Sequence, residues 1–361
     1  MSWPSWLPLC ETLRPLSPYG APQLPAEAVL NTNENPYSPS PALQKAITDA
    51  VAQVAADLNR YPDRDATVLR TKLATYINER SGTDFSLENI WAANGSNEII
   101  QSIFLAFAQG PVLGFIPSYS MHPLIAKTTG AQWIDGKRNL DFSLNTDDAV
   151  TEIIKNKPTL TFITTPNNPT GGAVTIEAIQ KLADAAQSVG GLLVVDEAYA
   201  EFSQEHSAVT LISKNPHVIV IRTMSKAFAF AGVRVGYLVS DEAVKDAMMI
   251  VRLPYHLGAL TQAAAQVAID HRAELLGGVS TLIAARAELV DALHQMGLQT
   301  IPSSANFILF TGFKQDAPQL WAALLEKGVL IRDVGLSGYL RTTIGNEAEN
   351  QLFISALKEL I

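Results

Sequence analysis

The chain has 361 residues, of which 47 % are hydrophobic and 17 % charged, enough for two or three domains around a large core. Its formal net charge of −9 argues against a general binder of nucleic acid or of anionic membranes, because both need a basic field. The single cysteine, Cys10, excludes an intrachain disulfide and a cysteine metal cluster. Together with a proline-broken start that lacks a basic region, it predicts a cytoplasmic protein without a signal peptide.

The first part of the chain predicts an arm followed by helices. Residues 1–40 are rich in proline and suit an irregular arm that contributes to a later, smaller domain and to a dimer contact. Helical patterns follow near Pro41–Leu58 and Ala66–Arg80.

Between residues 88 and 255, short apolar runs alternate with helical stretches. Such continuous runs are typical of strands buried on both faces, as in a parallel sheet between helices. Residues 41–255 therefore predict a large α/β domain with a largely parallel sheet. The runs are Ile90–Ala93, Val112–Ile116, Leu160–Ile163, Leu192–Val195, Val218–Ile221 and Val235–Val239.

After Pro254 the pattern changes, and residues 256–361 predict a smaller α+β domain. Its expected helices are Leu260–Arg272, Glu274–Met296 and Glu347–Leu360. Shorter strand signals lie between them, at Asn306–Phe310, Val329–Ile331 and Tyr339–Ile344.

Lys226 is the most informative single residue. A lysine amine forms a Schiff base with an aldehyde only while it is neutral, and both burial and a nearby cation lower its pKa. The apolar stretch Ala227–Ala231 would supply the burial, and Arg234, eight residues after the lysine, the cation. Alone, the segment favours an ordinary exposed lysine before a helix, because lysine side chains are mostly exposed.

Asp196 and Glu197 follow the buried run Leu192–Val195. Successive strand side chains point to opposite faces, so one carboxylate can face a site while the other caps or pairs. A carboxylate here could hold the N–H group of a pyridinium ring and keep that ring an electron sink. Alone, Asp196 also suits a helix cap or a turn.

Three further segments follow predicted strands, where ligands of open α/β sheets bind. Gly95-Ser96-Asn97 begins the apolar helix Ile99–Ala108 and offers free N–H groups to a phosphate. Asn168 lies in a turn of proline and glycine, and its amide could donate to a phenolate oxygen. Tyr119 could stack on a flat ring. A helix cap, a structural turn and a packed tyrosine are the alternatives.

The six histidines show no spacing typical of a metal site, and the chain has no G-x-S-x-G nucleophile elbow. His122 and His256 receive no role from the sequence.

The order of these elements along the chain resembles that of the fold-type I pyridoxal-phosphate aminotransferases. More narrowly, the chain is similar, over nearly its whole length, to the histidinol-phosphate aminotransferase family. The segments that carry this likeness are Leu30–Tyr37, Asn59–Asp63, Asp196–Phe202, Arg252–Tyr255 and Leu340–Gly345. The resemblance implies a mostly parallel seven-stranded sheet, pyridoxal 5′-phosphate as cofactor, and a homodimer with a composite active site.

The resemblance also implies roles for single residues toward this cofactor. Lys226 would form the internal aldimine and shuttle a proton, Asp196 would pair with the pyridine nitrogen, and Tyr119 would stack on the ring. Asn168 and Tyr199 would bond its phenolic oxygen, which makes Tyr199 part of the catalytic set. The phosphate would be held by Gly95, Ser96, Asn97, Thr223, Ser225 and Arg234, with Tyr61 reaching it from the neighbouring subunit.

On the substrate side, Arg341 would clamp an α-carboxylate and Arg332 a substrate phosphate, because arginine binds such groups bidentately. Tyr19 of the arm would lie over the substrate, and Asn33 and Asn168 would take part in binding it. For Arg332 a surface ion pair, for instance with Asp333, is the alternative.

The implied reaction transfers the amino group of L-glutamate to imidazole-acetol phosphate and gives L-histidinol phosphate and 2-oxoglutarate. An aromatic-amino-acid aminotransferase and a threonine-phosphate decarboxylase share some of these motifs and remain alternatives. A cofactor-sensing regulator is a third, but it would need an attached DNA-binding module, for which the proline-rich arm is too short.

Overall fold

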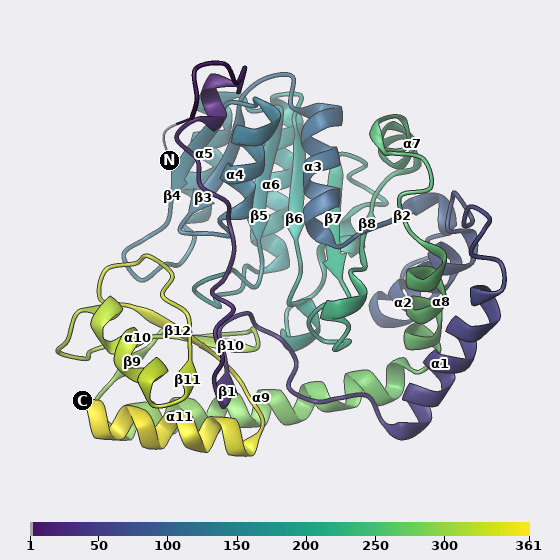
Figure 1. Ribbon diagram of the computed structural model, residues 1–361. Coiled ribbons are helices and arrows are strands. Elements are labelled where there is room, and N and C mark those ends of the chain that lie inside the picture. Colours follow the sequence, from purple (N-terminus) through teal and green to yellow (C-terminus); the bar gives the residue numbers. More distant parts are fainter. Residues whose placement is uncertain (1–2) are drawn as a thin grey trace.

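The computed structural model describes residues 3–361 and contains a sheet of seven strands with helices on both faces (Figure 1). The strand order is β2-β8-β7-β6-β5-β3-β4. Strands β3 to β7 pair in parallel, and β8 runs antiparallel to both of its neighbours. The strands are β2 (Ile90–Ala93), β3 (Val112–Ile116), β4 (Trp133–Lys137), β5 (Leu160–Thr164), β6 (Leu192–Asp196), β7 (Val218–Thr223) and β8 (Gly236–Val239).

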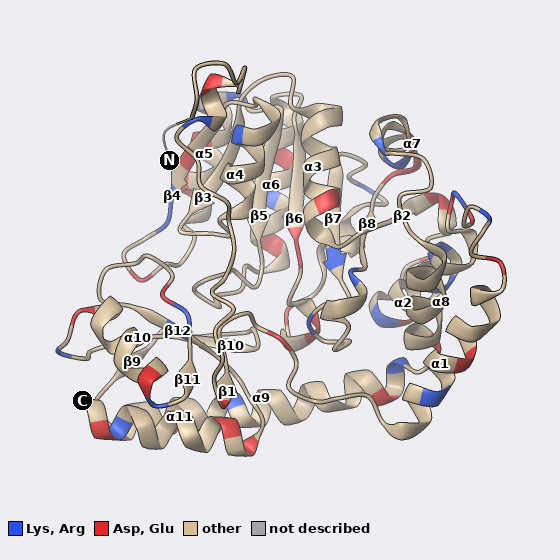
Figure 2. Ribbon diagram, in the orientation of Figure 1, with Lys and Arg blue, Asp and Glu red and all other residues tan. Residues whose placement is uncertain are grey.

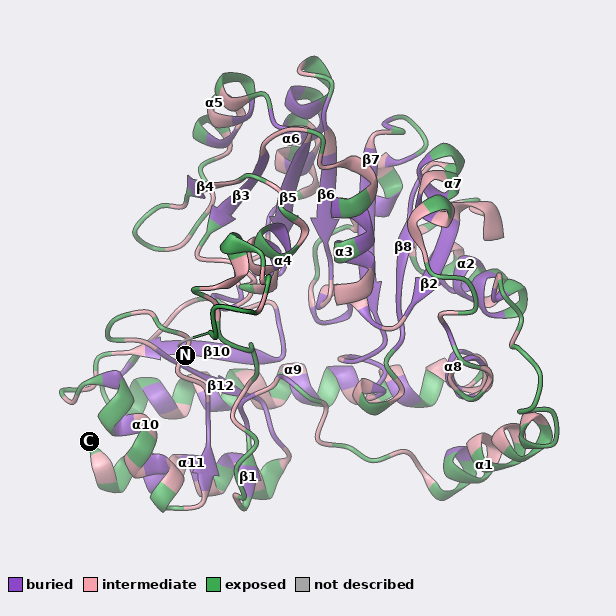
Figure 3. Cartoon of the chain, turned by 45° about the horizontal axis from the view of Figure 1, so that its top comes forward, coloured by how far each residue is buried: buried purple, intermediate pink, exposed green. Residues whose placement is uncertain are grey.

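Side chains of the central strands alternate between two hydrophobic clusters, one on each face of the sheet. Leu193 and Val195 enter one cluster and Val194 the other, and the same alternation continues in β7. Both faces are therefore buried, as the apolar runs predicted (Figure 3).

The helices divide between these two clusters. One cluster contains residues of α3 (Ser96–Phe107), α4 (Met121–Thr129) and α7 (Glu242–Val251). The other contains residues of α1 (Pro41–Ala55), α2 (Thr67–Ser81), α5 (Thr146–Asn156), α6 (Ile176–Ser188) and α8 (Ala259–Asp270).

Six of the seven strands coincide with the predicted apolar runs, and β4 was not predicted. Its segment, Trp133–Lys137, contains an aspartate, a glycine and a lysine. β4 is one of the two edge strands of the sheet, and its residues are mostly half-buried or exposed, so they need no continuous apolar run.

A third hydrophobic cluster lies under two small sheets near the C-terminal end of the chain. The sheets are formed by β1 (Ala28–Val29) with β11 (Val329–Leu330), and by β12 (Leu340–Thr343), β10 (Phe307–Thr311) and β9 (Gln299–Thr300). The helices here are α9 (Arg272–Gln295), α10 (Ala317–Glu326) and α11 (Glu347–Leu360). Strands β1 and β9 were not predicted, because β1 lies in the proline-rich arm and β9, Gln299–Thr300, is polar.

The domain boundaries stay a prediction. Strand β1 of the arm pairs with β11, so this part of the arm joins the C-terminal region. Helix α8 packs against α1 and α2 and shares their hydrophobic cluster, which favours a boundary inside α9 rather than at residue 255. Among residues 3–361, none of the helices combines the length and hydropathy that crossing a bilayer requires.

Candidate active site

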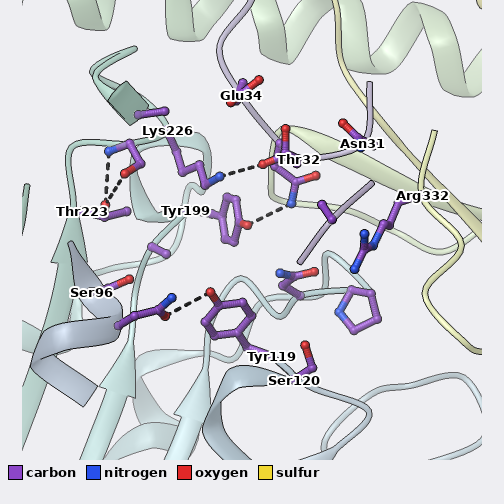
Figure 4. A pocket seen from close by; sticks show the side chains of 18 of the residues that line it. Asn31, Thr32, Glu34, Ser96, Tyr119, Ser120, Tyr199, Thr223, Lys226 and Arg332 are labelled. Carbon is purple, nitrogen blue, oxygen red and sulfur yellow. Dashed lines mark hydrogen bonds between the residues drawn. The ribbon is translucent and has the colours of Figure 1, made fainter. Parts of the chain in front are cut away.

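A cavity of about 570 Å³ opens at the carboxyl ends of β5, β6 and β7, where the arm and the segment 332–341 close over the large sheet (Figure 4). Parallel strands end at a common edge, which is the usual place of a ligand site in such sheets. Of the predicted site residues, fourteen line the cavity: Tyr19, Asn33, Ser96, Asn97, Tyr119, Asn168, Asp196, Tyr199, Thr223, Ser225, Lys226, Arg234, Arg332 and Arg341. Gly95 precedes this lining directly, and Tyr61 lies outside it.

Lys226 follows β7, and its Nζ donates a hydrogen bond of 2.8 Å to the carbonyl oxygen of Thr32 in the arm. Burial, and after it the cation of Arg341, lower the pKa of this amine to about 8. Arg234, the cation expected from the sequence, contributes least. Neutral amine is thus available near neutral pH, but mainly through burial and a residue 115 positions away, which a local pattern cannot reveal.

Asp196 ends β6 on the floor of the cavity. One of its carboxylate oxygens lies 3.1 Å from Nε2 of the buried His122, and the other accepts from the backbone N–H of Ala198. Glu197 points away from the cavity and pairs with Arg222, so the two adjacent acids do face opposite ways. His122 is a residue whose contact the sequence did not predict, because a histidine in a helix carries no signal of the strand that it faces.

The phosphate-binding residues expected from the sequence form a small polar cradle. The Thr223 hydroxyl donates to Oγ of Ser225 at 3.0 Å, and Nη1 of Arg234 donates to the same oxygen at 3.3 Å. Helix α3 begins here, and its N-cap, Gly95, has no side chain to occupy the first N–H groups. Gly95 has a φ of +83°, which strains other residues, and a Cβ there would also push the Arg234 guanidinium aside.

Two tyrosines stand on either side of the cavity. The Tyr119 hydroxyl donates to Oδ1 of Asn97 at 3.1 Å, and the Tyr199 hydroxyl accepts from Nδ2 of Asn33 at 2.9 Å (Figure 4). Burial raises the pKa of Tyr199, so its hydroxyl keeps its proton and can donate to a ligand oxygen. Asn33, expected to bind substrate, is buried and accepts from Thr343 with its remaining amide oxygen.

Arg341 and Arg332 lie at the far end of the cavity on antiparallel backbone segments that bridge each other. Arg341 donates to Oδ1 of Asn168 at 2.5 Å and to the carbonyl oxygen of Asn31 at 2.7 Å, while its buried Nε has no partner among residues 3–361. Burial lowers the pKa of Arg341 to about 10, which leaves it charged at neutral pH. The guanidinium of Arg332 forms no ion pair within the described chain, including with Asp333.

The arm covers one side of the cavity with Tyr19, whose hydroxyl accepts from Ser120 Oγ at 3.2 Å. Tyr61 is 79 % exposed and stacks on Tyr255 with ring centroids 4.3 Å apart. His256 lies under this turn, where its ring contacts the carbonyl oxygen of Ala92.

These residues together fit a flat pyridine aldehyde that carries a phosphate. One cavity is lined by Lys226 with its lowered pKa, by the carboxylate of Asp196 and by the ring of Tyr119. The polar cradle of Thr223, Ser225 and Arg234 lines the same cavity. The start of α3 has no side-chain cap, so its first N–H groups can bind an anion, and the buried, unpartnered Nε of Arg341 can bind another.

The chain is similar to a known protein family and to curated proteins. The model of the family described as "Aminotransferase class I and II" matches residues 27–357. A curated relative, a histidinol-phosphate aminotransferase of Mycobacterium sp. (strain JLS), is 53 % identical over 359 residues, which cover 98 % of this chain and 94 % of the relative.

Solved structures share the fold. A histidinol-phosphate aminotransferase from Sinorhizobium meliloti in complex with pyridoxal-5′-phosphate has a TM-score of 0.81 at 24 % identity, covering 93 % of this chain and 91 % of that one. An L-threonine-O-3-phosphate decarboxylase from Porphyromonas gingivalis reaches 0.77 at 23 %, covering 92 % and 99 %. Fold likeness therefore does not separate these two activities.

Proposed function

Because the chain belongs to the class I and II aminotransferase family, we propose that it transfers the amino group of L-glutamate to imidazole-acetol phosphate. The products are 2-oxoglutarate and L-histidinol phosphate, a step of histidine biosynthesis. The relatives at 53 % identity support this substrate. The observation that carries it is Arg332, a cation without an ion-pair partner in the described chain that faces the cavity of Lys226.

Pyridoxal 5′-phosphate supplies the chemistry as an aldehyde that takes up the amino group and as an electron sink. We assign its phosphate to the Thr223, Ser225 and Arg234 cradle and its pyridine nitrogen to Asp196. His122, bonded to the other side of this carboxylate, orients it. Asn168 and Tyr199 are assigned to the phenolic oxygen.

Lys226 carries protons during the reaction. Its pKa of about 8 lets Nζ both accept and release a proton near neutral pH, which is the property of an effective general base and acid. The carbonyl oxygen of Thr32 holds the amine in place on the arm side of the cavity.

The two arginines explain how one cavity accepts two unlike substrates. Imidazole-acetol phosphate carries no carboxylate, so Arg341 and Arg332 share its dianionic phosphate. Glutamate has two carboxylates, of which Arg341 takes the α-carboxylate and Arg332 the second. Both arginines suit this work because a guanidinium binds carboxylate and phosphate with the same fork of donors.

Turnover of several substrates side by side tests the proposal. Purified protein loaded with cofactor should convert histidinol phosphate with 2-oxoglutarate faster than it converts phenylalanine at equal concentration. Preference for phenylalanine would indicate the aromatic-amino-acid alternative. Release of carbon dioxide from threonine phosphate would indicate the decarboxylase, and binding without turnover the regulator.

We also propose a homodimer in which Tyr61 completes the partner's site. Tyr61 and Tyr255 form an exposed stack on two neighbouring turns, and Arg252 ties these turns together by an ion pair of 2.6 Å with Asp65. Leu253 on the same turns is 74 % exposed. Such an apolar surface suits a subunit contact.

Hybrid dimers test this composite site. Lys226→Ala and Tyr61→Ala proteins are each expected to be weakly active. Mixing equal amounts and allowing subunits to exchange should restore about a quarter of the wild-type activity, because each hybrid contains one intact site. Absence of any gain, with exchange verified by mass, would contradict the shared site.

A cytoplasmic location stays a prediction from Cys10.

A further inference from the structure

A buried cluster of charges lies at the ends of β6 and β7, outside the lining of the cavity. Figure 2 shows acidic and basic residues side by side there. The side chains of Arg222, Glu197 and Glu201 in this cluster are 1 %, 3 % and 3 % exposed. Ion pairs this deep require a full set of partners, because desolvating each charge costs several kcal/mol.

The cluster is almost fully paired around one guanidinium. Nη1 of Arg222 donates to Glu201 at 2.7 Å, Nη2 donates to the Ser207 hydroxyl at 3.0 Å, and Nε lies 2.9 Å from Glu197 as an ion pair without hydrogen-bond alignment. Tyr76 of α2 donates to the same Glu201 oxygen at 3.0 Å. Only the planar fork of an arginine reaches three such partners at once.

The anchored residues alternate with residues that line the cavity. Glu197 and Glu201 lie two positions before and after Tyr199, and Glu197 directly follows Asp196. Arg222 directly precedes Thr223 of the cradle, four residues before Lys226. Neighbouring strand side chains point to opposite faces, so fixing Glu197 and Arg222 from behind aims Asp196 and Thr223 into the cavity. Glu201 lies in the short helix Ala200–Phe202 that directly follows Tyr199, so its ion pair fixes the chain at this tyrosine.

We propose that Arg222 is a positioning residue of the reaction. From behind the sheet it fixes the segment of Asp196 and Tyr199 relative to the segment of Thr223 and Lys226. The inference rests on the proposed aminotransferase function. Arg222 does not contact the substrate, and its effect is not limited to the stability of the fold.

Arg222→Lys and Glu201→Gln test the proposal in the holoenzyme. Each keeps a polar group of similar size but loses part of the fork or its charge. The pH midpoint of the cofactor absorbance should shift by about 0.5 to 1 unit, because Asp196 and Tyr199 then stand differently toward the ring. The kcat should fall about 10- to 100-fold, as expected for a misplacement near 1 Å, with the KM for glutamate changed about twofold or less.

Tyr237→Phe is the matched control. Tyr237 lies opposite Arg222 on β8, is equally buried, and its hydroxyl has no partner among the described residues, so its removal should leave midpoint and kcat unchanged. If Arg222→Lys and Glu201→Gln lowered only the melting temperature, the cluster would be structural and the proposal wrong. The absorbance and the glutamate reaction do not depend on histidinol phosphate, so failure of that substrate in wild type would be recognised separately.

Discussion

The cavity has two unlike walls, which differ in how completely their side chains are paired. The sheet wall, formed by lining residues between 96 and 234, is paired before any ligand binds. Asp196 contacts His122, Tyr119 contacts Asn97, and Ser225 accepts from Arg234. Preorganised groups of this kind need no rearrangement during a reaction.

The arm wall, formed by lining residues 19–34 and 332–341, has side chains that are less completely paired. Arg332 has no ion-pair partner in residues 3–361, and Tyr19 is 49 % exposed. The contrast teaches that one wall suits a constant occupant, the cofactor, and the other a pair of exchanging substrates. Changes to the two walls should therefore give different kinetic signatures.

The largest effect is expected on the sheet wall, from Lys226→Ala. Transamination should fall by about 10⁴-fold, because the amine assigned to accept and release the proton is lost. The variant should still bind cofactor but without the absorbance band of the lysine-bound form. The exposed Lys45→Ala serves as control, and a band retained in Lys226→Ala would contradict the assignment.

On the arm wall, Arg332→Ala should lower kcat/KM for histidinol phosphate and for glutamate by about 10- to 100-fold, since one charge-assisted contact is lost. The cofactor spectrum should stay unchanged, which is the opposite of the Lys226 result. Single-turnover kinetics of each half-reaction measures both. Normal turnover of histidinol phosphate would refute the role of Arg332, and the exposed Arg80→Ala should behave as wild type.

Arg341 of the arm wall and Lys226 of the sheet wall interact electrostatically, and the pH dependence of cofactor binding measures this interaction. The neutral, reactive fraction of the amine grows as the pH rises through about 8, so cofactor capture by the apoprotein should rise with pH and level off above that value. Arg341→Gln should move the midpoint upward, because the Arg341 cation lowers the pKa of Lys226. Stopped-flow absorbance follows the capture, and a wild-type midpoint in the ordinary lysine range would contradict the burial.

The smallest effect is expected at the rim, from Tyr19→Phe. Its hydroxyl accepts one exposed hydrogen bond from Ser120, so KM should rise about two- to fivefold with kcat unchanged. Ser120→Ala should give the same change if the contact itself matters. A larger loss in Tyr19→Phe than in Ser120→Ala would indicate that the Tyr19 hydroxyl contacts the substrate directly.

Local patterns predicted most of the fold because they record local physics. Helix α11 begins at Glu347 as expected, where Asn346 and Glu349 form a capping box. The central strands were visible because both of their faces are buried. Strand β4 was missed because an edge strand can be polar. Strand β1 was missed because it lies in the proline-rich arm, and β9 because Gln299 and Thr300 are polar.

For the site, the sequence by itself determined which residues would meet at one edge of the sheet, since Asp196 and Lys226 follow strands and Gly95 precedes a helix. Only the tertiary structure decided their surroundings. It brings Arg341 close enough to lower the pKa of Lys226 and places His122 against Asp196. It also pairs Glu197 and Glu201, which flank Tyr199, with Arg222. These contacts join residues far apart along the chain, and the physical reason they escape the sequence is that charge and burial act through space rather than along the backbone.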